Sequence, residues 1–180
     1  LLINTILIGS GLYLFFVTTR DFFSKRLKNL HQNLAHFGFS LLILSILFNN
    51  IFSVEIITNL KVGESFKNDK FEITFNNIVP INQKNYLSLK GSFSIIEQNN
   101  LKNELEPELR IYNQPNIITS EADIKTTLFF DKFITMNKVQ NKEYFNIRYQ
   151  NKPFMIWIWI SVLLISLGGI LSLFKKKYEK

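Results

Sequence analysis

Three long stretches of the sequence are apolar and free of Asp, Glu, Lys and Arg. They cover residues 1–19, 34–54 and 154–174. A helix that crosses a bilayer needs about 20 mostly apolar residues, so we predict a transmembrane span over each stretch. The first stretch has no basic segment before it and an Arg- and Lys-rich segment after it, which favours a membrane span over a signal peptide.

The region between the last two apolar stretches, residues 55–153, has a different pattern. Several short runs are enriched in β-branched and aromatic residues with partial alternation, and Pro- and Asn-containing turn segments separate them. The runs are residues 71–75, 86–96, 126–130 and 144–149. We predict six or seven strands in a small antiparallel barrel or sandwich. A short helical turn is also predicted at residues 120–124, where Thr119 or Ser120 would cap a turn containing acidic residues.

The net charge of +7 is distributed unevenly. Residues 19–33 and residues 174–180 each carry +3, whereas residues 53–152 have 13 basic and 12 acidic side chains, a balance of +1. Because Lys and Arg beside membrane spans stay on the cytoplasmic side, residues 20–33 and 175–180 are predicted to be a basic cytoplasmic loop and tail. The predicted fold is therefore a membrane protein with α-helical transmembrane spans and a small all-β extracytoplasmic domain between the last two. The charge indicates topology, so no nucleic-acid partner is expected.

Few residues offer chemistry. The chain has no cysteine, which excludes a disulfide framework, a Cys-ligated metal and a Cys nucleophile. The acidic run at residues 104–108 fits paired carboxylates or a calcium site, but such a run is more often a solvated turn, and Arg110 offers an ion-pair partner. Trp157 and Trp159, near the outer end of the last apolar stretch, are typical of interfacial anchors. The chain begins inside an apolar run without Met, so we expect it to be a C-terminal piece of a longer protein.

The two histidines differ in their setting. His31 lies in the basic segment, where a solvated position is expected. His36 lies in the second apolar stretch, and an ionisable residue there tends to face a bundle interior, a cavity or a ligand. Imidazole is the usual axial ligand of haem iron, and the neighbouring Ala35 and Gly38 leave room for a flat macrocycle or a close helix. The simpler alternative is a histidine hydrogen-bonded to a neighbouring helix.

A series of short motifs resembles the C-terminal part of the CcmF haem lyase family of cytochrome c biogenesis. Each motif is weak alone, but their order and spacing together are fairly specific. The motifs are Ala35-His36-x-Gly38, Gly63-Glu64, Asn85-Tyr86, Pro107-Glu108-x-Arg110-x-Tyr112, Glu121-Ala122-x-Ile124, Arg148-Tyr149-x-x-Lys152-Pro153-Phe154-x-x-Trp157-Ile158-Trp159 and Gly168-Gly169. The chain departs from the family at Val62, where the family usually has Pro, and at Gln83-Lys84, where it has Gly-Pro.

The resemblance implies a function in cytochrome c maturation. Members of the family take haem from a periplasmic haem chaperone and attach it covalently to apocytochrome c. The family also holds a haem b in its membrane bundle, and His36 falls on one axial ligand of that iron, with the second ligand outside this chain. The implied partners are membrane lipid, the remaining part of the haem lyase, the haem chaperone, apocytochrome c and its thiol-reducing subunits. The location would be the bacterial inner membrane or, alternatively, the mitochondrial inner membrane, and no catalytic residue is assigned.

Two other classes of function remain open. The chain could be a non-enzymatic, membrane-anchored assembly or scaffold protein whose β-domain binds a partner. An ion or solute carrier is disfavoured, because the predicted spans hold a single ionisable residue and no pair of broken helices.

Overall fold

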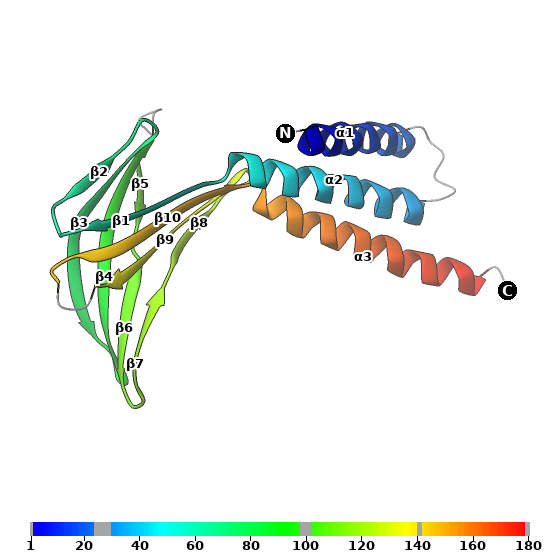
Figure 1. Cartoon of the computed structure of the whole chain (residues 1–180). Helices are drawn as coiled ribbons and strands as arrows, with labels where there is room; N and C mark the ends of the chain where they lie inside the picture. The colour runs from blue at the N-terminus through cyan, green and yellow to red at the C-terminus, as the bar shows by residue number, and fades with distance from the viewer. Residues whose placement is uncertain (1, 24–29, 98–101, 140–141, 179–180) are drawn as a thin grey trace. The chain divides into compact units, whose positions relative to one another are not determined.

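The computed structural model describes residues 2–23, 30–97, 102–139 and 142–178, and side chains within 5–22, 30–97, 102–139 and 142–174 (Figure 1). The chain divides into two compact units. The helical unit contains residues 1–53, 127–131 and 152–180, and the β unit contains residues 54–126 and 132–151.

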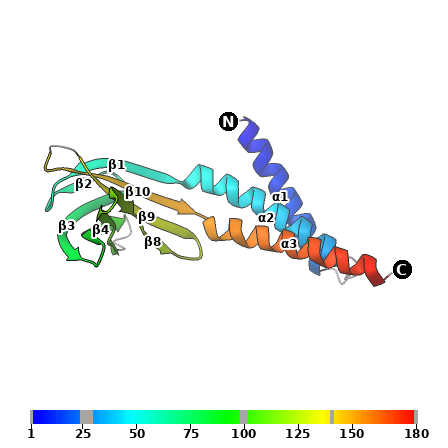
Figure 2. The same ribbon diagram turned by 90° about the horizontal axis from the view of Figure 1, so that it is seen from below.

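Three helices form most of the helical unit. They are α1 (Leu2–Phe23), α2 (Leu30–Phe52) and α3 (Met155–Tyr178). In both views α2 lies alongside α3 and also contacts α1 (Figures 1 and 2). Two helices in the described part of the chain, Leu30–Phe52 and Met155–Phe174, are long and apolar enough to cross a membrane. The first predicted span forms a helix as well, and its passage through a membrane stays a prediction.

Small residues allow α2 and α3 to approach closely. An ideal Cβ at Gly38 would lie 2.9 Å from Leu164 Cβ, and one at Gly168 would lie 2.7 Å from the carbonyl oxygen of His31. Glycine at these two positions therefore lets the helix backbones meet, as small residues do between membrane helices. The contact between α1 and α2 is instead made by side chains, including Phe15 and Phe37, whose ring centroids are 5.4 Å apart.

The helix boundaries differ from the predicted spans. α2 begins at Leu30, inside the predicted basic loop, and ends at Phe52, so Val54 already belongs to a strand. α3 continues through most of the predicted tail to Tyr178. Lys25, Arg26 and Lys28 lie outside the described residues. The cytoplasmic placement of the basic segments therefore stays a prediction.

The β unit is a sandwich of two antiparallel sheets, which confirms the all-β prediction and selects the sandwich over the barrel. The four-stranded sheet has the order β1 (Val54–Leu60), β10 (Phe145–Pro153), β9 (Phe130–Lys138) and β8 (Asp123–Thr126). The six-stranded sheet has the order β2 (Ser65–Lys67), β3 (Phe71–Asn82), β4 (Tyr86–Glu97), β6 (Glu108–Asn113) and β7 (Asn116–Glu121), with β5 (Lys102–Leu105) paired to β4.

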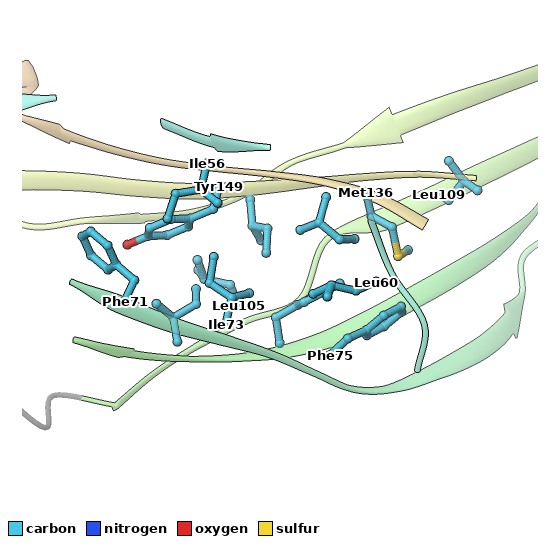
Figure 3. Close-up of a cluster of buried hydrophobic side chains, with 13 residues drawn as sticks. Ile56, Leu60, Phe71, Ile73, Phe75, Leu105, Leu109, Met136 and Tyr149 are labelled. Atoms are coloured by element: carbon cyan, nitrogen blue, oxygen red, sulfur yellow. The ribbon is translucent and has the colours of Figure 1, made fainter. Parts of the chain in front are cut away.

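The core of the β unit lies between the inner faces of the two sheets (Figure 3). Phe71, Ile73 and Phe75 of β3 are buried in alternation with more exposed residues, so the period of two that predicted this strand marks its inner face. Phe75 stacks on Phe93 of β4 with ring centroids 4.3 Å apart. Tyr149 of β10 meets Phe71 edge-on at 5.7 Å. The Tyr149–Phe71 contact joins the two sheets, whereas the Phe75–Phe93 stack lies within the six-stranded sheet.

Two local predictions in the β unit were wrong, and the number of strands was underestimated, since its described residues form ten. Residues 120–124 form the end of β7 and the start of β8 instead of a helical turn. β7 pairs with β6 along its whole length, from Asn113↔Asn116 to Glu108↔Glu121, and these hydrogen bonds outweigh the local capping preference. Residues 127–129 are a turn between β8 and β9, closed by a hydrogen bond from Thr127 N to Phe130 O of 2.9 Å.

Candidate functional site

His36 is exposed on a face of α2 that is turned away from its contacts with α1 and α3. Gln32, Phe39 and Ile46 lie on the same face, because they follow or precede His36 at helical spacing, and all are exposed. We call Gln32, His36, Phe39 and Ile46 the His36 stripe. Phe39 and Ile46 are 51% and 50% exposed, so the stripe combines two exposed apolar side chains with the Gln32 amide and the His36 imidazole.

The surroundings of His36 bear on the two interpretations of this residue. No hydrogen bond or ion pair joins its side chain to another described residue, including those of α1 and α3. The space beside Gly38 is filled by Leu164 and Ile165 of α3, so that glycine accommodates a close helix and not a macrocycle. An exposed imidazole with an unused ring nitrogen and apolar neighbours fits the requirements of an axial haem ligand.

His31 does not complete such a site with His36. Side chains share a helix face at spacings of three or four residues, and these two histidines are spaced differently. His31 lies where α3 passes, because its carbonyl oxygen borders Gly168. A second haem ligand would therefore have to come from outside the described part of this chain.

The two tryptophans occupy different environments at the start of α3. Trp159 is 64% exposed. Trp157 is partly buried, and its Nε1 has no hydrogen-bond partner among the described atoms. It lines an apolar cavity of about 310 Å³ in the helical unit together with Leu44, Phe48 and Phe154. Interfacial anchoring, predicted for both, fits the exposed Trp159 and stays a prediction.

The acidic run of the β unit is paired with basic side chains. Lys90 Nζ lies 2.6 Å from Glu106 Oε2, and Arg110 Nε lies 3.1 Å from Glu108 Oε2. The hydrogen bond to Glu106 raises the pKa of Lys90 above its ordinary value of 10.5. The described residues hold no group of three or more His, Cys, Asp or Glu side chains that fits a metal ion. The structure supports the ion pairing offered for this run, but only Glu106 and Pro107 lie between strands, since β5 ends at Leu105 and β6 begins at Glu108.

Separate sequence motifs converge beside this run. Tyr86 and Tyr112 lie opposite each other on β4 and β6, with ring centroids 5.1 Å apart. The guanidinium of Arg110 lies over the Tyr86 ring at 5.3 Å, and Arg110 Nη1 is 3.7 Å from Glu121 Oε1 on β7. The sequence shows these residues in motifs that are separate along the chain. Their proximity was not predicted, because it depends on the strand register that places them on one face.

Comparisons with known proteins agree with this architecture. Residues 51–153 match the protein family described as "CcmF C-terminal beta-sandwich". The cytochrome c-type biogenesis protein CcmF of Haemophilus influenzae is 31% identical over 146 residues, covering 81% of this chain and 22% of that protein. CcmF of Escherichia coli is 27% identical over 146 residues, covering 81% of this chain and 23% of that protein.

A solved structure of a similar protein, the "Cytochrome c Heme Lyase CcmF", shares the fold. The TM-score is 0.67 at 18% identity, over 93% of this chain and 30% of that chain. The chain thus spans about 22% of the length of the first of these relatives and 30% of the solved chain. Because the family match covers the whole β-sandwich and the structural likeness extends over the helices, the chain belongs to the CcmF family and contains its C-terminal β-sandwich.

Proposed function

We propose that this chain acts in cytochrome c maturation as part of a membrane haem lyase, which attaches haem covalently to apocytochrome c. The observation that carries the proposal is the exposed imidazole of His36, which has no hydrogen-bond or ion-pair partner among the described residues and lies beside the exposed Phe39 and Ile46. The names of the relatives support the process, since they are cytochrome c-type biogenesis proteins.

In this proposal His36 is one axial ligand of a haem b, and the second ligand comes from another segment or chain. Phe39 and Ile46 would pack against the apolar surface of the porphyrin and keep water from the iron. A ligating imidazole needs an acceptor for its other ring nitrogen, and in this proposal Gln32, one helical turn before His36 on the same exposed face, supplies its amide oxygen. A bound haem supplies one-electron redox chemistry.

The reacting thiols belong to apocytochrome c in this proposal, which is consistent with the absence of cysteine from the sequence. The chain would then contribute orientation, by positioning haem against the reacting thiols. We infer a multi-pass location in the bacterial inner membrane with the β-sandwich on the periplasmic side. The two apolar helices and the basic segments support this placement.

The proposed partners follow from the same function: membrane lipid, the rest of the haem lyase, a periplasmic haem chaperone, and apocytochrome c with its thiol-reducing subunits. In this proposal the rest of the haem lyase supplies the second iron ligand, and apocytochrome c supplies the thiols.

The test is the haem content of the haem lyase purified from membranes, measured by absorbance per protein. We expect His36→Gly to lose the haem b absorbance and added imidazole to restore part of it, because free imidazole can occupy the vacated ligand position. His31→Ala is the matched control and should keep its haem. Unchanged haem content in His36→Gly would refute the ligand assignment, whereas equal losses in both variants would point to a general loss of structure.

A further inference from the structure

β7 is an edge strand of the six-stranded sheet. In the described part of the chain it pairs with β6 only, so its outer edge carries backbone N–H and C=O groups without a strand partner (Figure 1). Ile117 and Ile118 on this strand are 49% and 60% exposed. Natural edge strands are usually protected by charge, proline or a covering element, and an open one is a template for another strand.

The outer face beside this edge has the composition of a binding surface. The register places Tyr112 opposite Ile117 and Arg110 opposite Thr119, and these four side chains share the face of the sheet away from the core. Tyr86 extends the same face on the other side of β6. Tyrosine and arginine are, with tryptophan, the residues enriched at the energetic centres of protein interfaces.

Carboxylates outnumber cations where β7 ends. A cavity of about 270 Å³ there is lined by Lys90, Glu106, Glu108, Arg110, Glu121, Ala122 and Asp123. Four of these side chains are acidic and two are basic, which leaves a balance of −2. Lys90 and Arg110 are already engaged, by Glu106 and by Glu108 and Glu121 respectively. The local charge therefore favours a partner that brings cations.

We propose that the open edge of β7 binds an extended, basic peptide segment of a partner protein as an added strand. Its backbone would pair with β7, and its alternate side chains would lie on the outer face beside Ile117, Thr119 and Glu121. Cross-strand pairing then selects an apolar residue beside Ile117 and a Lys or Arg beside Glu121. The inference is independent of the haem ligand, since it concerns the β-sandwich alone, and its binding assay contains no haem.

The probe is a short synthetic peptide whose odd positions alternate between lysine and valine and whose even positions are threonine. In an extended strand, the lysine and valine side chains then share one face and the threonine side chains share the other. Its binding to the whole chain in detergent micelles is followed by fluorescence anisotropy. We expect saturable binding that weakens with salt, and about tenfold weaker binding of the same peptide with glutamate in place of lysine. A third peptide, N-methylated at alternate backbone positions, keeps the side chains and removes the hydrogen bonds, so it should fail to bind.

Two charge-reversal variants test the location. Glu121→Lys should weaken the lysine peptide about tenfold. Glu143→Lys is the matched control, because Glu143 is also an exposed acid in an ion pair, with its Oε2 3.0 Å from Lys61 Nζ. Glu143 lies just before β10 in the sequence and does not line the cavity beside β7. It should leave binding unchanged. Equal affinity of the lysine and glutamate peptides, equal effects of the two variants, binding of the N-methylated peptide, or no binding up to roughly 1 mM peptide would each overturn the proposal.

Discussion

α3 passes α2 at Gly168 with no space for a side chain. An ideal Cβ there would lie 2.7 Å from His31 O, 2.8 Å from Ala35 N and 2.9 Å from Ala35 Cβ. Relaxed contacts between such atoms are about 3.5 Å, so a methyl group would push the helices apart by several tenths of an ångström. The obstructing atoms are mainly backbone and cannot rotate away. Overpacking of this kind costs about 1–3 kcal/mol.

The adjacent Gly169 provides the matched control, because a Cβ there meets nothing within 4 Å. Replacing a helical glycine by alanine stabilises a helix by roughly 0.5–1 kcal/mol when no clash occurs. Both variants gain this contribution, so their difference isolates the clash at about 1–3 kcal/mol. At about 2–4 °C per kcal/mol, Gly168→Ala should unfold ~2–12 °C below Gly169→Ala.

The assay is thermal unfolding of the detergent-solubilised protein, followed by the circular dichroism of its helices. Gly169→Ala should match or exceed the wild type in Tm, and Gly168→Ala should fall below Gly169→Ala. If both variants shifted Tm equally, the close contact between α2 and α3 at this point would be incorrect, and with it the orientation that turns His36 away from α3.

Two further predictions concern the β unit. Phe75→Ala removes a fully buried ring stacked on Phe93 and should lower the free energy of unfolding in urea by about 3–5 kcal/mol. Val79→Ala, at a 48% exposed position, should change this free energy by less than about 0.5 kcal/mol. Similar losses in the two variants would contradict the core assignment. Burial and the charge of Glu97 raise the pKa of the Tyr149 phenol above its ordinary value of 10.0, so the folded state holds this proton more tightly than the unfolded state. The resulting stability is complete below about pH 10 and is lost as the pH rises further, so the urea midpoint of the wild type should fall more steeply above about pH 10 than that of Tyr149→Phe. Parallel curves would show that Tyr149 ionises freely in the folded protein.

Element types were predictable where the pattern is local and long. The charge-free stretches became helices, and the alternating runs at residues 71–75 and 86–96 became β3 and β4. The prediction of a helical turn at residues 120–124 was wrong. Its local signal, a capping residue followed by acidic residues, competes with hydrogen bonds to residues distant in the sequence. Ser120 Oγ donates to Met136 O at 2.7 Å, and Glu121 pairs with Glu108 across the sheet. A local pattern does not contain those partners.

The candidate site was predictable only in part. The sequence singled out His36 because an ionisable side chain is costly in an apolar stretch. It did not indicate the direction of the side chain, which depends on where α1 and α3 contact α2. Likewise, Tyr86 stood in one motif and Arg110 and Tyr112 in another, and the pairing of β4 with β6 brings the two motifs together.

The sequence by itself determined which segments avoid water, where the basic charge concentrates, and the family that the ordered motifs resemble. These properties are sums over neighbouring residues, so they can be read along the chain. The tertiary structure decided that the β region is a sandwich, that β7 pairs with β6 alone among the described strands, and that His36 lies on an exposed face of α2. Those features depend on strand register and on which face of a helix meets its neighbour. A shift of one residue turns the side chains of a strand to its opposite face and rotates those of a helix by about 100°.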